Sequence, residues 1–236
     1  MERICVTGIE SAYGRKKVLR GVDLSAEAGQ CVGIVGANGC GKSTLLNILA
    51  GLRRADKGMI AFDGVVADCI TQERQRPPKG SEQLFIRYTG YVPQENTLIP
   101  ELSVRDNLLL WYGGGEVLER ELAEGFLHML GLAEMCSQKV GKLSGGMKKK
   151  VSIGCALAGN PPVLLLDEPG AALDLPGKAK VREHLQRYKG MGGTVLLATH
   201  EETELDICDK LYALKEGRCR EIDVRLRGDA LLSQIL

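Results

Sequence analysis

The chain has 236 residues, 44% of them hydrophobic and 26% charged, which is enough to bury the core of a globular domain. Lys and Arg total 31 against 30 for Asp and Glu, and aromatic residues make up only 4%. Proteins that bind nucleic acid typically carry a basic excess and stacking aromatic side chains, so this composition argues against that class.

No run approaches the roughly 18 consecutive apolar residues of a membrane-spanning helix, and residues 1–5 lack the architecture of a signal peptide. The eight cysteines show neither a CxxC pair nor the spacing of a zinc site. We therefore expect buried, reduced thiols in a cytosolic protein.

The first third of the chain predicts strands on either side of a glycine-rich loop. Apolar residues alternate between positions 4 and 24, which indicates antiparallel strands. Residues 31–35 form a continuous apolar run, which is typical of a strand buried on both faces. A helix over 43–49 and a strand over 59–62 are predicted to follow the loop.

The middle of the chain predicts a loop and then helices. Residues 68–83 are mostly polar or charged and contain two prolines, which indicates a surface loop. Residues 102–130 have helical periodicity, and the glycines at 113–115 are expected to join two helices within it. A further helix is predicted over 145–157.

Strands are expected again in the last third, over 163–166 and, beyond a helix, over 194–199. A hairpin over 210–222 and a short terminal helix complete the predicted elements. The order is that of an α/β fold with a mostly parallel sheet, because right-handed crossovers bring such strands side by side.

We expect one domain over residues 1–236. Residues 1–94 and 158–222 would form its α/β core, with an antiparallel β subdomain at the N-terminus. Residues 95–157 would form an inserted helical subdomain, and residues 223–236 a C-terminal tail.

The strongest motif fits G-x-x-x-x-G-K-[ST] between a predicted strand and a predicted helix. Glycines let successive backbone N–H groups point at phosphate oxygens, and the helix presents its positive end to the same anion. Lys42 can reach the β and γ phosphates, and the Ser43 hydroxyl can bind Mg²⁺. The candidate ATP-binding residues of this loop are Gly36, Ala37, Asn38, Gly39, Cys40, Gly41, Lys42, Ser43 and Thr44.

A second motif places two carboxylates at the end of the apolar strand 163–166. At the carboxyl edge of a parallel sheet, Asp167 would face the phosphate loop and hold Mg²⁺. Glu168 comes next and can polarise an attacking water molecule.

The third motif is Leu143-Ser144-Gly145-Gly146-Met147, in which Ser144 stands 23 residues before Asp167. It resembles the signature sequence of ABC ATPases, usually written LSGGQ. Glycines at the start of a helix, together with the Ser144 hydroxyl, make a second anion site. The resemblance covers about residues 2–222 and implies a P-loop NTPase with a RecA-like core.

The resemblance also implies ATP and Mg²⁺ as ligands and assigns four further residues. Tyr13 would stack on the adenine, and Asp174 would lie in the loop that crosses between two ATPase subunits. Gln94 looks like the glutamine that contacts Mg²⁺ and the attacking water, and His200 like the histidine that touches the γ phosphate. Glu168, His200 and Gln94 are therefore the candidate catalytic residues.

Two positions depart from the family pattern. Met147 replaces the final glutamine of the signature, as is familiar among exporters, and Gly170 stands where threonine or serine is common. Gly170 leaves the rate of hydrolysis open. We expect the lysines at 148–150 to form the solvated face of a helix, and His128 and His184 to be surface residues.

The resemblance implies that two ATPase subunits pair, as a homodimer or a heterodimer, because one chain carries one copy of each motif. A separate integral membrane permease would be the second partner, which places the chain at the cytoplasmic face of a membrane, and no nucleic acid is expected. The motif sequences favour export, with an importer subunit or a soluble ABC ATPase as alternatives.

Residues 91–106 are expected to line the groove that receives the permease. The apolar Leu98, Ile99 and Leu102 would lie in it.

Overall fold

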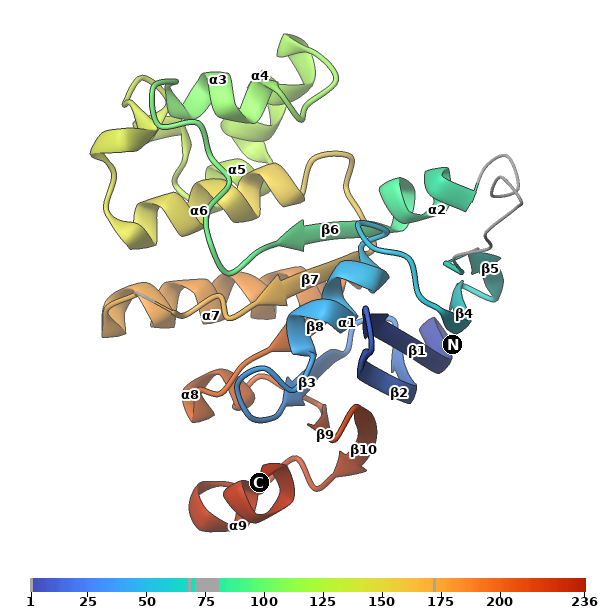
Figure 1. Ribbon diagram of the computed structural model, residues 1–236. Coiled ribbons are helices and arrows are strands. Elements are labelled where there is room, and N and C mark those ends of the chain that lie inside the picture. Colours follow the sequence, from blue (N-terminus) through green and yellow to red (C-terminus); the bar gives the residue numbers. More distant parts are fainter. Residues whose placement is uncertain (1, 68, 71–80, 172) are drawn as a thin grey trace.

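The computed structural model describes residues 2–67, 69–70, 81–171 and 173–236 (Figure 1). An antiparallel sheet with the strand order β2-β1-β4-β5 forms the N-terminal part, as the alternating pattern predicted. In its register, Ile4 of the first strand stands between Ala26 and Phe62 of its neighbours, and all three are buried. The strands are β1 (Glu2–Tyr13), β2 (Lys16–Glu27), β4 (Lys57–Phe62) and β5 (Val65–Ala67).

The second sheet has six strands in the order β10-β9-β3-β8-β7-β6. All neighbours in it run parallel except the terminal hairpin of β9 and β10, so the prediction of a mostly parallel sheet is confirmed. The strands are β3 (Cys31–Val35), β6 (Thr89–Val92), β7 (Val163–Asp167), β8 (Thr194–Ala198), β9 (Lys210–Lys215) and β10 (Arg218–Ile222).

The parallel sheet separates two hydrophobic cores. Along β7, Leu164 and Leu166 belong to the core shared with the helices that precede and follow the strand. Val163 and Leu165 belong to the core shared with the antiparallel sheet and the helix after β3. Every residue of β3, β7 and β8 is buried, because side chains on both faces are covered.

Four helices gather at one end of the molecule, at the upper left of Figure 1. They are α3 (Val104–Leu109), α4 (Gly115–Glu124), α5 (Phe126–Met129) and α6 (Gly145–Ala156). A capping box of Ser103 and Asp106 starts α3, and Gly113 and Gly114 separate α3 from α4 as predicted. The other helices are α1 (Lys42–Leu49), α2 (Ser81–Tyr88), α7 (Leu175–Gly190), α8 (Glu202–Leu205) and α9 (Gly228–Ile235).

Three local predictions were wrong. The loop expected over 68–83 ends earlier, because α2 begins at Ser81; residues 68 and 71–80 lie outside the described part of the chain. His184 is buried on α7, with Phe126 packed 6.5 Å from it between ring centroids, and burial lowers the pKa of its imidazole. Lys149, expected in solvent, is also buried. His128 is exposed, as predicted.

None of the described helices has the length and apolar character needed to cross a membrane.

Candidate functional site

The glycine-rich loop connects β3 to α1 at the carboxyl edge of the parallel sheet. Gly39 and Gly41 have φ angles of 75° and 115°, a region that side chains disfavour. A Cβ on Gly36 would lie 2.4 Å from the carbonyl oxygen of Leu214, so the loop could not pass β9 with any other residue there. A curled, glycine-rich loop ahead of the N-terminus of α1 is the kind of backbone whose N–H groups can face an anion.

Lys42 lies at the first position of α1 and is only 5% exposed. Its Nζ donates to the carbonyl oxygens of Gly36 at 2.8 Å and Ala37 at 3.3 Å. The ammonium therefore lies within the curve of the loop, where it can meet an anion bound to the same N–H groups.

Asp167 ends β7 directly beside the helix start. Burial raises the pKa of its carboxyl, and a hydrogen bond from the Ser43 hydroxyl together with the charge of Lys42 opposes that rise. The neighbouring Tyr91, which sequence reasoning missed, also contacts this carboxyl, and burial raises the pKa of its phenol. The hydroxyl and carboxylate oxygens of Ser43 and Asp167 are donors of the kind that Mg²⁺ prefers.

Glu168 lies just beyond Asp167 with a φ of 45°, the left-handed conformation, and its N–H donates to the carbonyl of Ala198 at 2.8 Å. Both carboxylate oxygens have partners. Gln94 Nε2 donates to Oε2 at 2.8 Å, and His200 Nδ1 lies 3.2 Å from Oε1. A strained backbone held by neighbours on both sides is common at functional sites.

The three side chains come from three parallel strands. Gln94 follows β6, Glu168 follows β7 and His200 follows β8, and these strands are neighbours in the sheet. Because the carboxyl ends of parallel strands meet at one edge, residues far apart in the sequence converge there. The structure therefore brings the three predicted catalytic residues into direct contact.

These residues face a pocket of about 540 Å³ that also contains the phosphate loop. It is lined by Tyr13, by six of the nine predicted residues of the phosphate loop and by the three catalytic candidates, and in addition by Lys16 and Val18 from β2. The lining residues are Tyr13, Lys16, Val18, Asn38, Gly39, Gly41, Lys42, Ser43, Thr44, Gln94, Glu168 and His200.

Tyr13 lies at the rim of this pocket and is 52% exposed. The Arg53 guanidinium lies 3.8 Å from the centre of its ring, and Arg53 Nη2 donates to the carbonyl of Ala12 at 2.7 Å. This cation–π contact orients the ring. No pattern in the sequence indicated this contact, because Arg53 comes from the turn after α1.

The signature residues lie elsewhere in the chain. Ser144 caps α6, with its Oγ accepting from Met147 N at 3.3 Å, and neither it nor Gly145 or Gly146 lines the 540 Å³ pocket. Asp174 caps α7 by accepting from Gly177 N at 2.9 Å and is likewise outside that pocket. Within one chain, these predicted ATP contacts are not brought to the phosphate loop.

The signature and the start of α7 are neighbours, however. A Cβ on Gly146 would stand 3.6 Å from Leu173. Ala172, in the same predicted crossing loop, lies outside the described residues. Ser144 and Asp174 are both exposed, so a second molecule can reach them.

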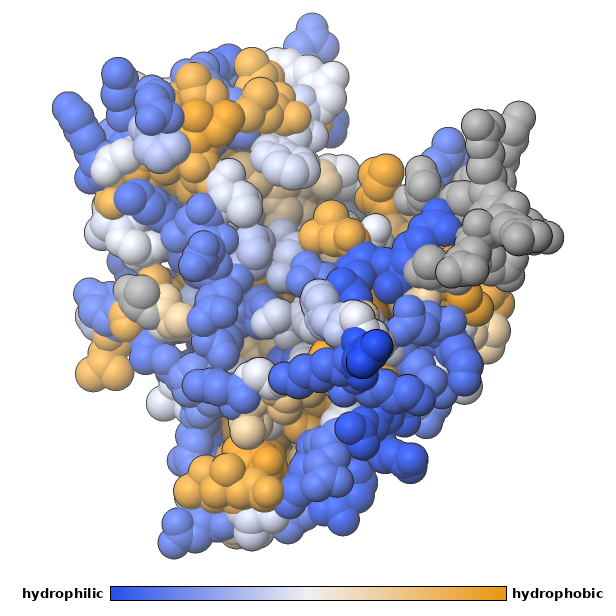
Figure 2. All heavy atoms as spheres, viewed as in Figure 1, coloured by the Kyte–Doolittle hydropathy of each residue, from blue (hydrophilic) through white to orange (hydrophobic). Residues whose placement is uncertain are grey.

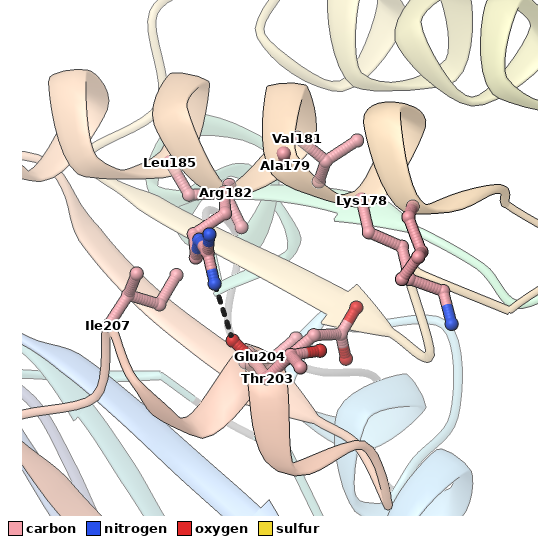
Figure 3. Close-up of a pocket in the computed structure, with 10 residues that line it drawn as sticks. Lys178, Ala179, Val181, Arg182, Leu185, Thr203, Glu204 and Ile207 are labelled. Carbon is pink, nitrogen blue, oxygen red and sulfur yellow. Dashed lines mark hydrogen bonds between the residues drawn. The ribbon is translucent and has the colours of Figure 1, made fainter.

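A smaller hollow of about 90 Å³ lies between α7 and α8 and holds none of the predicted site residues. Figure 3 shows Lys178 and Arg182 of α7 across from Thr203 and Glu204 of α8, with Arg182 Nη1 donating to the Thr203 carbonyl at 3.3 Å.

Comparison with known proteins decides the family. A family described as ABC transporter matches residues 19–171, which is more than half of the chain. The chain belongs to the ABC transporter ATP-binding family. The phosphate loop, the carboxylates of β7 and the signature all fall within or beside the matched segment.

The curated relatives of this ABC ATPase include exporter subunits. The Nod factor export ATP-binding protein I of Burkholderia orbicola (strain AU 1054) is 37% identical over 216 residues, 89% of this chain and 67% of the relative. The linearmycin resistance ATP-binding protein LnrL of Bacillus subtilis (strain 168) is 31% identical over 234 residues, 95% of this chain and 72% of the relative.

Solved ABC cassettes share the fold. The dimeric structure of the bacterial cassette MJ0796 superposes with a TM-score of 0.79 at 29% identity, covering 95% of this chain and 100% of that one. A structure of the same cassette in a post-hydrolysis state, bound to ADP and phosphate, has a TM-score of 0.79 at 28% identity, with the same coverage of both chains. The predicted family and fold class are confirmed.

Proposed function

We propose that this chain binds and hydrolyses MgATP at a dimer interface and that hydrolysis powers export through a separate membrane permease. The observation that carries the proposal is the placement of Glu168 between Gln94 and His200, facing the pocket of the phosphate loop. A solved relative bound to ADP and phosphate supports hydrolysis.

In this proposal the phosphate loop binds the nucleotide. Backbone N–H groups between residues 36 and 44 and the Lys42 ammonium offset the phosphate charges, and Tyr13 stacks on the adenine. Ser43, Asp167 and Gln94 would hold Mg²⁺, which supplies positive charge to the phosphate oxygens. Ser43 and Gln94 line the same pocket, Asp167 accepts a hydrogen bond from the Ser43 hydroxyl, and these oxygen donors fit that ion.

Glu168 orients and polarises the attacking water. The water oxygen bonds to the γ phosphorus, the bond from that phosphorus to the bridging oxygen of ADP breaks, and the water proton leaves toward the Glu168 carboxylate. Gln94 and His200 fix the two carboxylate oxygens by hydrogen bonding. His200 lines the same pocket as the phosphate loop, so its imidazole can also reach the γ phosphate.

A second subunit completes the site. Ser144, Gly145, Gly146 and Asp174 lie outside the pocket of their own chain, and we assign them to the ATP held by the partner. The dimeric structure of a solved relative supports this arrangement. Pairing could join two copies of this chain or two related chains.

The permease partner and the direction of transport rest on the relatives, whose names refer to Nod factor export and linearmycin resistance. We propose that the chain works at the cytoplasmic face of a membrane, with residues 95–157 acting as a helical subdomain on the core formed by 1–94 and 158–222. Figure 2 shows apolar side chains gathered over the helical end of the molecule, which supports contact with a partner there.

A hollow of about 320 Å³ lies at the junction of β6 and α6 and is the proposed docking groove. Gln94, Asn96 and Leu98 line one side of it, and Gly145 and Lys148 line the other. A partner seated there would contact the segment that carries Gln94.

The purified subunit tests this function directly. Phosphate release from ATP should require Mg²⁺ and stop when EDTA is added. Lys42→Ala should abolish binding of a fluorescent ATP analogue, whereas Lys215→Ala, which removes an exposed lysine at the end of β9, should leave it unchanged. Equal nucleotide affinity in both variants would refute the assignment of the phosphate loop.

A further inference from the structure

Lys149 is a buried cation on the signature helix. Only 2% of the residue is exposed, although its neighbours Lys148 and Lys150 are partly open to solvent. Its Nζ donates to the carbonyl oxygens of Pro93 at 3.0 Å and Gln94 at 3.1 Å. The ammonium therefore reaches from α6 to the segment that follows β6.

Burying this charge is unfavourable, and desolvation lowers the pKa of the ammonium, partly offset by the charges of Asp167 and Glu204. An apolar side chain would avoid the cost but would leave two carbonyl groups without this donor. Buried charged groups add little net stability, so we look for the role of this contact in the geometry it defines. The geometry that Lys149 defines is the backbone position of residue 94.

That backbone carries the side chain that reaches the reaction centre. Gln94 Nε2 donates to Glu168 Oε2 at 2.8 Å. A second contact joins the same two segments, since Ser152 Oγ lies 2.9 Å from Asn96 Oδ1. The side chains of α6 thus hold the Gln94 segment from one side while Glu168 holds it from the other.

We propose that Lys149 is a positioning residue that sets Gln94 against Glu168 and couples this contact to the signature at the start of α6. The proposal rests on the proposed ATPase function. Because α6 is one continuous helix from Gly145 to Ala156, a shift of Pro93 and Gln94 is transmitted through Lys149 to Ser144. Ser144 is the group assigned above to the ATP of the partner subunit.

A lysine suits this position for a definite reason. Its ammonium has three donors and can serve both carbonyls at once, whereas methionine has similar length and no donor. Lys149→Met therefore removes the link while keeping the apolar stem. Lys150→Met, one residue further along α6, removes an equal charge and provides the matched control.

Two measurements on the purified subunit test the proposal. In hydrogen exchange, Lys149→Met should speed exchange of the amides of residues 94–97 and leave β3 and β7 protected. In steady-state ATPase assays kcat should fall by roughly tenfold to a hundredfold, because small misplacements of catalytic groups cost that much, while ATP affinity is retained. Lys150→Met should match the wild type in both.

A double-mutant comparison distinguishes positioning from a general structural role. In a Gln94→Ala background, Lys149→Met should lower kcat little further, because Lys149 acts through Gln94. The proposal would be overturned if the fold losses in kcat of the two single variants multiplied in the double variant. It would also be overturned if hydrogen exchange over residues 94–97 were unchanged in Lys149→Met.

Failure of the proposed function gives a different result. If the wild type itself releases no phosphate, the ATPase proposal fails, and the exchange experiment alone decides the role of Lys149. If Lys149→Met does not fold, Lys149→Leu, which also lacks a donor, carries the same readouts.

Discussion

The carboxylate of Glu204 occupies the space that a side chain at position 170 would need. A Cβ on Gly170 would stand 2.3 Å from Glu204 Oε1, and the same carboxylate accepts hydrogen bonds from the Gly170 N–H and the Thr199 hydroxyl. Its other oxygen, Oε2, has no hydrogen-bond partner among the described residues. Gly170 departs from the usual family residue, and Glu204 supplies a physical reason.

This pairing predicts non-additive substitutions. Gly170→Ala should lower the free energy of unfolding by about 1–3 kcal/mol, because the added methyl overpacks a buried carboxylate. In a Glu204→Ala background, Gly170→Ala should lower the free energy of unfolding by clearly less, since the space is then free. Denaturant unfolding of the four proteins measures the coupling, and simple additivity would show that the two residues are independent.

Glu204 also predicts a pH dependence of stability. Burial, with the charge of Glu201, raises the pKa of its carboxyl above the unfolded-state value. The native state therefore holds this proton more tightly, and the stability it contributes is present below about pH 4 and is lost as pH rises through the raised pKa.

Glu204→Gln should consequently gain stability relative to the wild type as pH rises from about 4 toward neutrality. Melting temperatures at a series of pH values measure this. Glu183→Gln, at an exposed carboxyl on α7, is the control and should give a difference that varies little. If the melting temperature of Glu204→Gln relative to the wild type fell with rising pH, the pKa of Glu204 would not be raised as assigned.

Assembly depends on the signature. Glu168→Gln should bind ATP without turning it over, so light scattering should show its mass double on addition of MgATP. Adding Ser144→Arg should prevent this by placing a bulky cation where the partner's phosphate is expected, whereas Ser233→Arg on the exposed side of α9 should not. If the protein with both Glu168→Gln and Ser144→Arg still dimerised, Ser144 would not lie at the interface.

Of the three apolar residues predicted to lie in the groove, Leu98 lines the hollow of about 320 Å³, whereas Ile99 and Leu102 are beside it in the sequence but outside its lining. Leu98 is half-buried and packs against the core of the helical end, whereas Ile99 is 41% exposed and its backbone is held by Asn107. Leu98→Asp should therefore lower the melting temperature. Ile99→Asp should keep fold and ATPase activity but lose co-purification with the permease; retained co-purification would place docking elsewhere.

Features that depend on a short stretch of residues could be predicted from the sequence. The glycines around Lys42 and the carboxylates after an apolar strand predict their own local conformation, and the parallel sheet brings Glu168 to Gln94 and His200. Lys149 shows the limit. Three consecutive lysines indicate a solvated face, and only the tertiary contact with the Pro93 carbonyl explains why one is buried.

The central claim is that Glu168 activates the water that hydrolyses ATP, and one substitution tests it most directly. Glu168→Gln keeps the size of the side chain and removes the carboxylate, so turnover of MgATP should fall by about a hundredfold or more while the affinity for ATP is unchanged. A glutamine variant that releases phosphate at the wild-type rate would contradict the account.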